Sequence, residues 1–103
     1  MPIPETTRHG LARRLEQHRR QHWPLIEVVL RYRTPFAYID GVDPDGDVLP
    51  LCRLRYQGSP NEWGFAIYLA SRDGYEDSIL PTGSFTGTPE DALDCACGLY
   101  LNY

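Results

Sequence analysis

Residues 63–101, WGFAIYLASRDGYEDSILPTGSFTGTPEDALDCACGLYL, decide the fold of this chain. The stretch opens with bulky apolar residues at every second position, and small or aromatic residues stand between them. This alternation predicts a strand over 63–71, and its two apolar faces favour a central strand that is covered on both sides. An Asp73-Gly74 pair then predicts a turn into a second strand over 75–80, which is followed by an irregular loop over 81–87.

The same stretch closes with the signals of a helix. Thr88-Pro89-Glu90-Asp91 combines a capping hydroxyl, a proline at the first helical position and acidic residues in the first turn. The apolar residues of this helix recur with helical spacing, so we expect them to pack against the sheet. They are Ala92, Leu93, Ala96, Cys97, Tyr100 and Leu101.

The N-terminal segment predicts a weakly anchored basic helix. Thr7 is a suitable cap, and Trp23-Pro24 ends the helix near His22 because the residue before a proline avoids the helical region. Leu11 and Leu15 are the strong apolar residues of its inward face. We therefore expect this helix to be less stable than the rest of the chain.

Three further strands are expected between the two helices. Alternating β-branched and aromatic residues predict strands over 25–33, 36–42 and 48–56. Thr34-Pro35 turns the chain after the first strand, and Asp43-Pro44-Asp45-Gly46-Asp47 has the turn chemistry needed after the second.

The predicted fold class is α+β: an N-terminal helix, an antiparallel sheet of four or five strands, and a C-terminal helix packed on the sheet. A single domain spans 1–103, with 1–24 as a basic helical arm and 25–103 as the sheet plus closing helix. Pro50 lies inside the third strand and requires either an edge position or a bulge there.

Composition indicates a small soluble protein. A hydrophobic content of 42% over 103 residues fits one globular domain. The chain has no apolar run near the length of a membrane span and no visible signal peptide. Three cysteines are an odd number, which argues against a secreted disulfide framework and for a cytoplasmic location.

The charges are divided along the chain. All ten basic residues are Arg, as coding in a GC-rich genome would give. Residues 1–33 hold seven Arg and three Glu, whereas 34–103 hold three Arg and eleven acidic residues. We expect a basic surface at one end and an acidic surface at the other. Guanidinium groups suit phosphate, so the candidate nucleic-acid contacts are Arg13, Arg14, Arg19, Arg20, Arg31 and Arg33.

No metal or cofactor is expected. Cys95 and Cys97 stand two apart on a helix and point in different directions, and Cys97 belongs to the apolar stripe. His18 and His22 have a spacing that can hold a metal, but no carboxylate or thiol nearby completes a set of ligands, and the neighbouring Arg19 and Arg20 would repel a cation.

The acidic residues are also explained without a site. Asp43, Asp45 and Asp47 lack the spacing of an EF-hand loop and are interpreted as a hairpin turn. No Ser/His/Asp signature or phosphate-binding glycine loop is present, so no catalytic residue is predicted.

The closing stretch resembles the N-terminal domain of HicB-like antitoxins, which has a strand, a DG turn, a strand, an LP loop, a short strand and a helix with a TPEEAL-like start. The matching residues are Gly64-Phe65-Ala66-Ile67, Asp73-Gly74-Tyr75, Leu80-Pro81, Phe85-Thr86-Gly87 and Thr88-Pro89-Glu90-Asp91-Ala92-Leu93. In that family the domain begins near its first strand and a DNA-binding segment usually follows it, whereas about 60 residues precede the match here. The resemblance implies that the protein neutralises a small RNA-cleaving toxin, with its acidic surface towards the basic toxin.

These observations predict a non-enzymatic, cytoplasmic binding module with a protein partner, antitoxin-like if the resemblance holds. The whole chain also resembles small proteins of actinobacteria. One alternative is a nucleic-acid-binding accessory protein that uses the Arg-rich N-terminal helix. Another is a small enzyme whose site assembles from scattered residues such as His18, Asp73 and Tyr75. Strand order and oligomeric state stay open.

Overall fold

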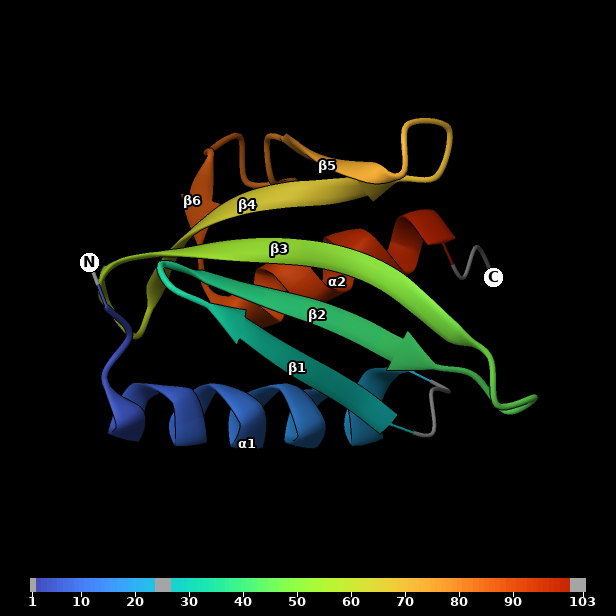
Figure 1. Ribbon diagram of the computed structural model, residues 1–103, viewed down its shortest axis with the longest axis horizontal. Coiled ribbons are helices and arrows are strands. Elements are labelled where there is room, and N and C mark those ends of the chain that lie inside the picture. Colours follow the sequence, from blue (N-terminus) through green and yellow to red (C-terminus); the bar gives the residue numbers. More distant parts are fainter. Residues whose placement is uncertain (1, 24–26, 101–103) are drawn as a thin grey trace.

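A computed structural model describes residues 2–23 and 27–100 and has the predicted α+β fold (Figure 1). The elements follow one another as α1 (Glu5–His22), β1 (Glu27–Arg33), β2 (Phe36–Val42), β3 (Val48–Ser59), β4 (Glu62–Leu69), β5 (Gly74–Asp77), β6 (Thr86–Gly87) and α2 (Pro89–Tyr100).

The sheet is an antiparallel meander. Its strand order is β1-β2-β3-β4-β5, so each strand pairs with its neighbours in sequence. The two-residue strand β6 pairs with the start of β4, and β5 pairs with the rest of the same edge. The predicted antiparallel sheet is thus confirmed, and its order is the one that short hairpin connections favour.

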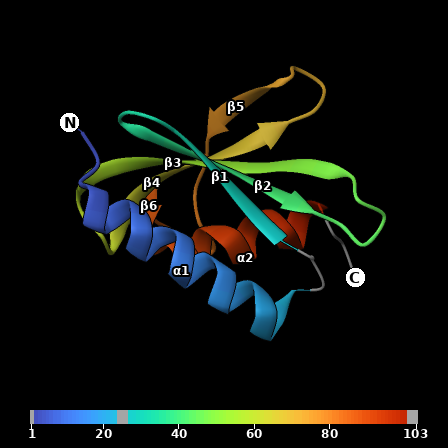
Figure 2. The same ribbon diagram turned by 60° about the horizontal axis from the view of Figure 1, so that its bottom comes forward.

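Both helices lie on the same face of the sheet (Figure 2). Helix α1 packs on β1, α2 packs on β3 and β4, and the two helices contact each other. The buried core lies between the helices and the strands and includes Leu11, Leu15, Ile39, Leu54 and Trp63. No helix of the described chain covers the other face, so the expectation that β4 is covered on both sides is wrong.

Several predicted turn and cap interactions are present. The Asp43 carboxylate accepts hydrogen bonds from the backbone N–H groups of Asp45 and Asp47, at 3.0 and 2.9 Å. Thr88 Oγ1 accepts one from the backbone N–H of Asp91 at 3.2 Å, which caps α2. The predicted irregularity at Pro50 is a bulge, where the register between β2 and β3 shifts.

Two boundaries differ from the prediction at the N-terminal half. Helix α1 begins at Glu5 rather than after Thr7, and no side chain caps it. Strand β3 continues to Ser59, beyond the end at residue 56 that the sequence predicts, so only a tight turn separates it from β4. The register between β3 and β4 shifts in this extension, where Gly58 has a positive φ of 97°. The first two residues of the strand predicted over 25–33 lie outside the described residues.

Strand β5 is shorter than predicted. It ends at Asp77, whereas the sequence suggested a strand up to Leu80. Leu80 instead enters the core, where it is almost fully buried, so the backbone leaves the strand ladder before this residue.

The apolar stripe of α2 faces the sheet as expected. Ala92, Leu93, Ala96 and Cys97 are buried, and Leu93 is 0% exposed. Tyr100 ends the helix, but its side chain lies outside the described part of the structure, as does Leu101.

Replacing Leu93 by Ala should lower the free energy of unfolding by roughly 2–5 kcal/mol, because truncation of a buried leucine leaves a cavity. Leu99 on the same helix is 56% exposed, so Leu99→Ala is a matched control and should change stability by about 0.5 kcal/mol or less. Urea denaturation followed by circular dichroism measures both. Equal midpoints for the two variants would show that Leu93 does not hold α2 on the sheet.

Candidate functional site

The structure divides the six candidate arginines between two surfaces. Arg13, Arg14, Arg19 and Arg20 belong to α1, on the core side of the sheet. Tyr32 of β1 faces α1, because its hydroxyl donates a hydrogen bond to the Arg8 carbonyl at 3.1 Å. Since side chains alternate along a strand, the neighbouring residues of β1 point away from α1. These neighbours are Arg31 and Arg33.

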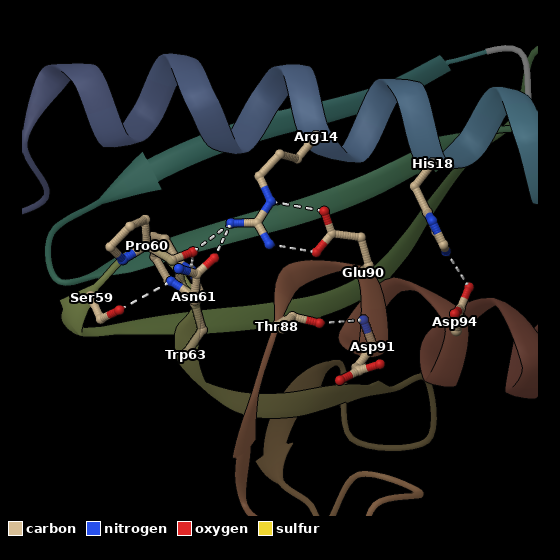
Figure 3. A network of polar contacts seen from close by, with 10 residues as sticks. All are labelled: Arg14, His18, Ser59, Pro60, Asn61, Trp63, Thr88, Glu90, Asp91 and Asp94. Carbon is tan, nitrogen blue, oxygen red and sulfur yellow. Dashed lines mark hydrogen bonds and ion pairs between the residues drawn. The ribbon is translucent and has the colours of Figure 1, made fainter.

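Arg14 is fully engaged in a network within the protein (Figure 3). Its Nε and Nη2 atoms donate to the two carboxylate oxygens of Glu90 at 2.8 and 2.7 Å. Its Nη1 atom donates to the Pro60 carbonyl and to Asn61 Oδ1, both at 2.9 Å. Arg14 therefore joins α1 to α2 and to the turn between β3 and β4.

A second acidic residue engages two more arginines of α1. Glu16 pairs with Arg19, and Glu16 Oε1 lies 3.5 Å from Arg20 Nε. The hydrogen bond from Arg19 holds the pKa of Glu16 below its usual range, and the backbone N–H of Val28 adds a further hydrogen bond. Among the described residues, Arg13 forms no ion pair. The arginines of α1 are thus largely committed to contacts inside the protein.

The uncovered face of the sheet holds a second set of arginines with aromatic residues between them. We call this surface the open face. Its residues are Glu27, Val29, Arg31, Arg33, Phe36, Tyr38, Asp40, Val42, Val48, Pro50, Arg53, Arg55, Gln57, Gly64, Ala66, Tyr68, Tyr75 and Asp77.

The strand register arranges the open face in rows across the sheet. One row consists of Arg33, Phe36, Arg55, Gly64 and Thr86. The next row consists of Arg31, Tyr38, Arg53, Ala66 and Asp77. Arginine and an aromatic ring alternate in both rows over the first three strands, and β4 then supplies a small residue.

The guanidinium groups lie over the rings. Arg53 Cζ is 4.3 Å from the centroid of Phe36 and 5.7 Å from that of Tyr75. Arg55 Cζ lies 5.8 Å from the Phe36 centroid, and Arg31 Cζ lies 5.4 Å from that of Tyr38. Cation–π contacts of this kind hold the guanidinium groups close to the rings.

Two of the four arginines on this face are paired with acids. Arg31 Nε donates a hydrogen bond to Asp40 Oδ2 at 3.1 Å, and its hydrogen bonding with Asp40 raises the pKa of Arg31. Arg53 Nη2 lies 3.5 Å from Asp77 Oδ1. Arg33 and Arg55 have no carboxylate partner within residues 2–23 and 27–100, so they leave positive charge available to a ligand.

Sequence reasoning missed Arg53 and Arg55, which it counted with the acidic part of the chain. The signal was the alternation within β3, where Cys52, Leu54 and Tyr56 are buried and the arginines stand between them. A charged residue at every second position of a half-buried strand marks its solvent face.

The residues proposed for a scattered catalytic site do not meet. His18 lies on the helical side, where its Nε2 is 2.7 Å from Asp94 Oδ1, a partner that the sequence did not suggest. Tyr75 lies on the open face, and the Asp73 carboxylate accepts a hydrogen bond from the Tyr68 hydroxyl at 2.6 Å. The sheet separates His18 from the other two residues.

The cysteine and aspartate clusters have structural explanations. Burial raises the pKa of Cys97 to about 12 and raises the pKa of Cys52 still further, which keeps both thiols protonated. The carboxylates of Asp43, Asp45 and Asp47 lie within 4.8 Å of one another because the β2–β3 turn brings them together.

Within the described ranges, neither α1 nor α2 is both long and apolar enough to cross a membrane. Comparison of the chain with protein-family models, curated proteins and solved structures finds no match.

Arg14→Met should lower the free energy of unfolding by about 1–3 kcal/mol at neutral pH, because it leaves the partly buried Glu90 carboxylate without its donors. Arg13→Met, which changes an exposed neighbour, is the matched control and should have little effect. Thermal unfolding at a series of pH values measures the difference.

The effect of Arg14→Met should also depend on pH. Burial alone would raise the pKa of Glu90, but the Arg14 hydrogen bonds, a backbone hydrogen bond and the Arg14 charge together hold that pKa below its usual range. A lowered carboxyl pKa contributes stability that is complete above the unfolded-state pKa and is lost as the pH falls through the folded-state pKa. The gap between wild type and variant should therefore close in acid, and a gap that persists there would contradict this role.

Proposed function

We propose that the protein is a non-catalytic binding module that takes single-stranded nucleic acid on the open face of its sheet. The observation that carries this proposal is the alternation of arginine and aromatic residues in two adjacent rows of that face. Single strands bind to surfaces that combine aromatic rings for the bases with cationic groups for the backbone.

The open face suits a charged ligand better than a second apolar surface. Its aliphatic residues are few, namely Val29, Val42, Val48 and Ala66, and charged side chains lie among the rings. The centres of protein–protein interfaces are depleted of charged residues. Guanidinium groups beside aromatic rings present both a positive charge for phosphate and a planar surface for a base.

The open face also replaces α1 as the preferred nucleic-acid surface. All three guanidinium nitrogens of Arg14 donate hydrogen bonds to acceptors within the protein. Glu16 forms ion pairs with Arg19 and Arg20. Arg33 and Arg55 have no such competitor among the described residues, so phosphate gains their charge without breaking an ion pair.

The experiment compares two charge-matched double variants by fluorescence anisotropy with labelled oligouridine and oligothymidine. Arg33→Glu/Arg55→Glu removes the unpaired cations of the open face, and Arg13→Glu/Arg20→Glu makes the same charge change on α1. We expect the open-face variant to lose affinity and to reduce the slope of log K against log salt by roughly two, since each phosphate contact contributes about one. The α1 variant should bind as the wild type does.

The opposite ranking would assign nucleic-acid binding to α1. An absence of binding by the wild type, at low as well as moderate salt, would reject a nucleic-acid function on either surface.

A protein partner is the second candidate, and the position of the turns favours it. The β2–β3 turn and the β4–β5 turn lie at the same end of the sheet (Figure 1). They carry Asp43, Asp45, Asp47 and Asp73, so this end is acidic and complements a basic protein. A small RNA-cleaving toxin, which the HicB-like resemblance implies, is a partner of this kind.

Capture from native lysate, with and without nuclease, separates the two candidates. Asp45→Lys/Asp47→Lys reverses the charge of the acidic end and spares Asp43, which holds the turn. A basic protein that survives nuclease, binds Arg33→Glu/Arg55→Glu and is lost with the aspartate variant would establish the protein candidate. A captured set that disappears with nuclease would exclude it.

A further inference from the structure

The open face is hollowed where β4 carries its small residues. The hollow has a volume of about 400 Å³, within the range of roughly 300–1,000 Å³ that is typical of small-ligand sites. Its floor is Gly64 and Ala66, at positions where the neighbouring strand β3 carries arginine. The inference drawn from it rests on the proposed function, because it concerns one part of the same surface.

Gly64 keeps the floor of the hollow open. A Cβ atom at this position would come within 3.0 Å of Gln57 Nε2 and 3.4 Å of Arg55 Cβ. The Gln57 amide therefore lies directly above the bare backbone of Gly64. Any side chain at position 64 would occupy the space and displace this amide.

Aromatic rings line the hollow. Phe85 is 59% exposed, although such a large apolar ring is usually buried. Its carbonyl accepts a hydrogen bond from the backbone N–H of Phe65 at 3.2 Å, which fixes the position of this residue beside β4. Phe36 also lines the hollow and carries the Arg53 and Arg55 guanidinium groups near its ring.

The Gln57 amide is the neutral polar side chain of the hollow that stays uncommitted among the described residues. Thr86 also lines it, but the Thr86 hydroxyl already donates to Glu62 Oε1 at 3.0 Å. Across the described chain, no hydrogen bond engages the Gln57 side chain. An amide offers a donor and an acceptor side by side, and the edge of a nucleobase presents the complementary pair.

We infer that the hollow holds one nucleobase of the bound single strand. The base stacks on the exposed ring of Phe85, and its edge meets the Gln57 amide above Gly64. Arg55, at the rim, contacts the adjoining phosphate. The remaining bases lie on the rows of rings across the sheet without a pocket of their own, so this position is where base identity affects affinity.

The test fills the hollow and leaves the charges in place. Gly64 is not in the left-handed region of backbone conformation, so Gly64→Val is compatible with the strand, and valine favours strands. We expect Gly64→Val to weaken binding of labelled oligouridine or oligoadenosine about fivefold or more, with an unchanged salt slope, because a stacking contact and no phosphate contact is lost. Gly10→Ala on α1, where an added Cβ meets nothing within 4 Å, is the control and should leave affinity unchanged.

Two further variants keep the test decisive if Gly64→Val fails to fold. Phe85→Ala removes the exposed ring and should give a loss of similar size. Gln57→Ala should change the order of affinities among oligoadenosine, oligouridine and oligocytidine.

The outcomes separate this inference from the function on which it depends. Absence of wild-type binding rejects both. Binding that depends on Arg33 and Arg55 but is the same in Gly64→Val, Phe85→Ala and wild type rejects the base pocket alone. Displacement of the oligonucleotide by micromolar free AMP would overturn the inference, because the hollow would then be a site for a free mononucleotide and not for one base of a bound strand.

Discussion

The bidentate ion pair between Arg14 and Glu90 ties the two helices together over the same face of the sheet. The two residues are separated by 76 positions, and their pairing joins the first helix to the last. The same guanidinium group binds the turn between β3 and β4 through the Pro60 carbonyl. Leu11 and Leu15 supply the buried apolar contacts of α1, and the polar contacts of Arg14 add to them.

Once both helices occupy one face, the alternation within each strand sorts the remaining side chains. In β3, Cys52 and Leu54 go to the core, and Arg53 and Arg55 are left on the other side. The meander then places these arginines beside the rings of β2, which gives the open face its alternating rows. A binding surface thus follows from the placement of two helices and the two-residue period of a strand.

Local chemistry was the part of this fold that the sequence could predict. The Thr88 cap, the Asp43 turn and the alternating strands depend on neighbours within a few residues, so they are visible in the sequence. The Arg14–Glu90 pair was not predictable, because nothing in either segment indicates a partner so far away. Arg14 therefore appeared among the candidate ligand contacts, although its guanidinium group is engaged inside the protein.

The candidate surface could be predicted only in part for the same reason. Arg31 and Arg33 were found from their charge, but their separation from α1 depends on which face the helix covers. Arg55 was overlooked because it lies in an acidic region of the chain, whereas its neighbours in space belong to β2 and β4. Net charge along a sequence does not describe the charge of a surface that a sheet assembles from several strands.

The most direct test of the open-face account is the change in backbone amide NMR shifts during titration with oligouridine. We predict shifts that concentrate at Arg33, Phe36, Arg55 and Gly64, with α1 unperturbed. Shifts that concentrate along α1, at Arg13 and Arg20, or no shifts at saturating oligonucleotide, would contradict the assignment of the open face as the binding surface.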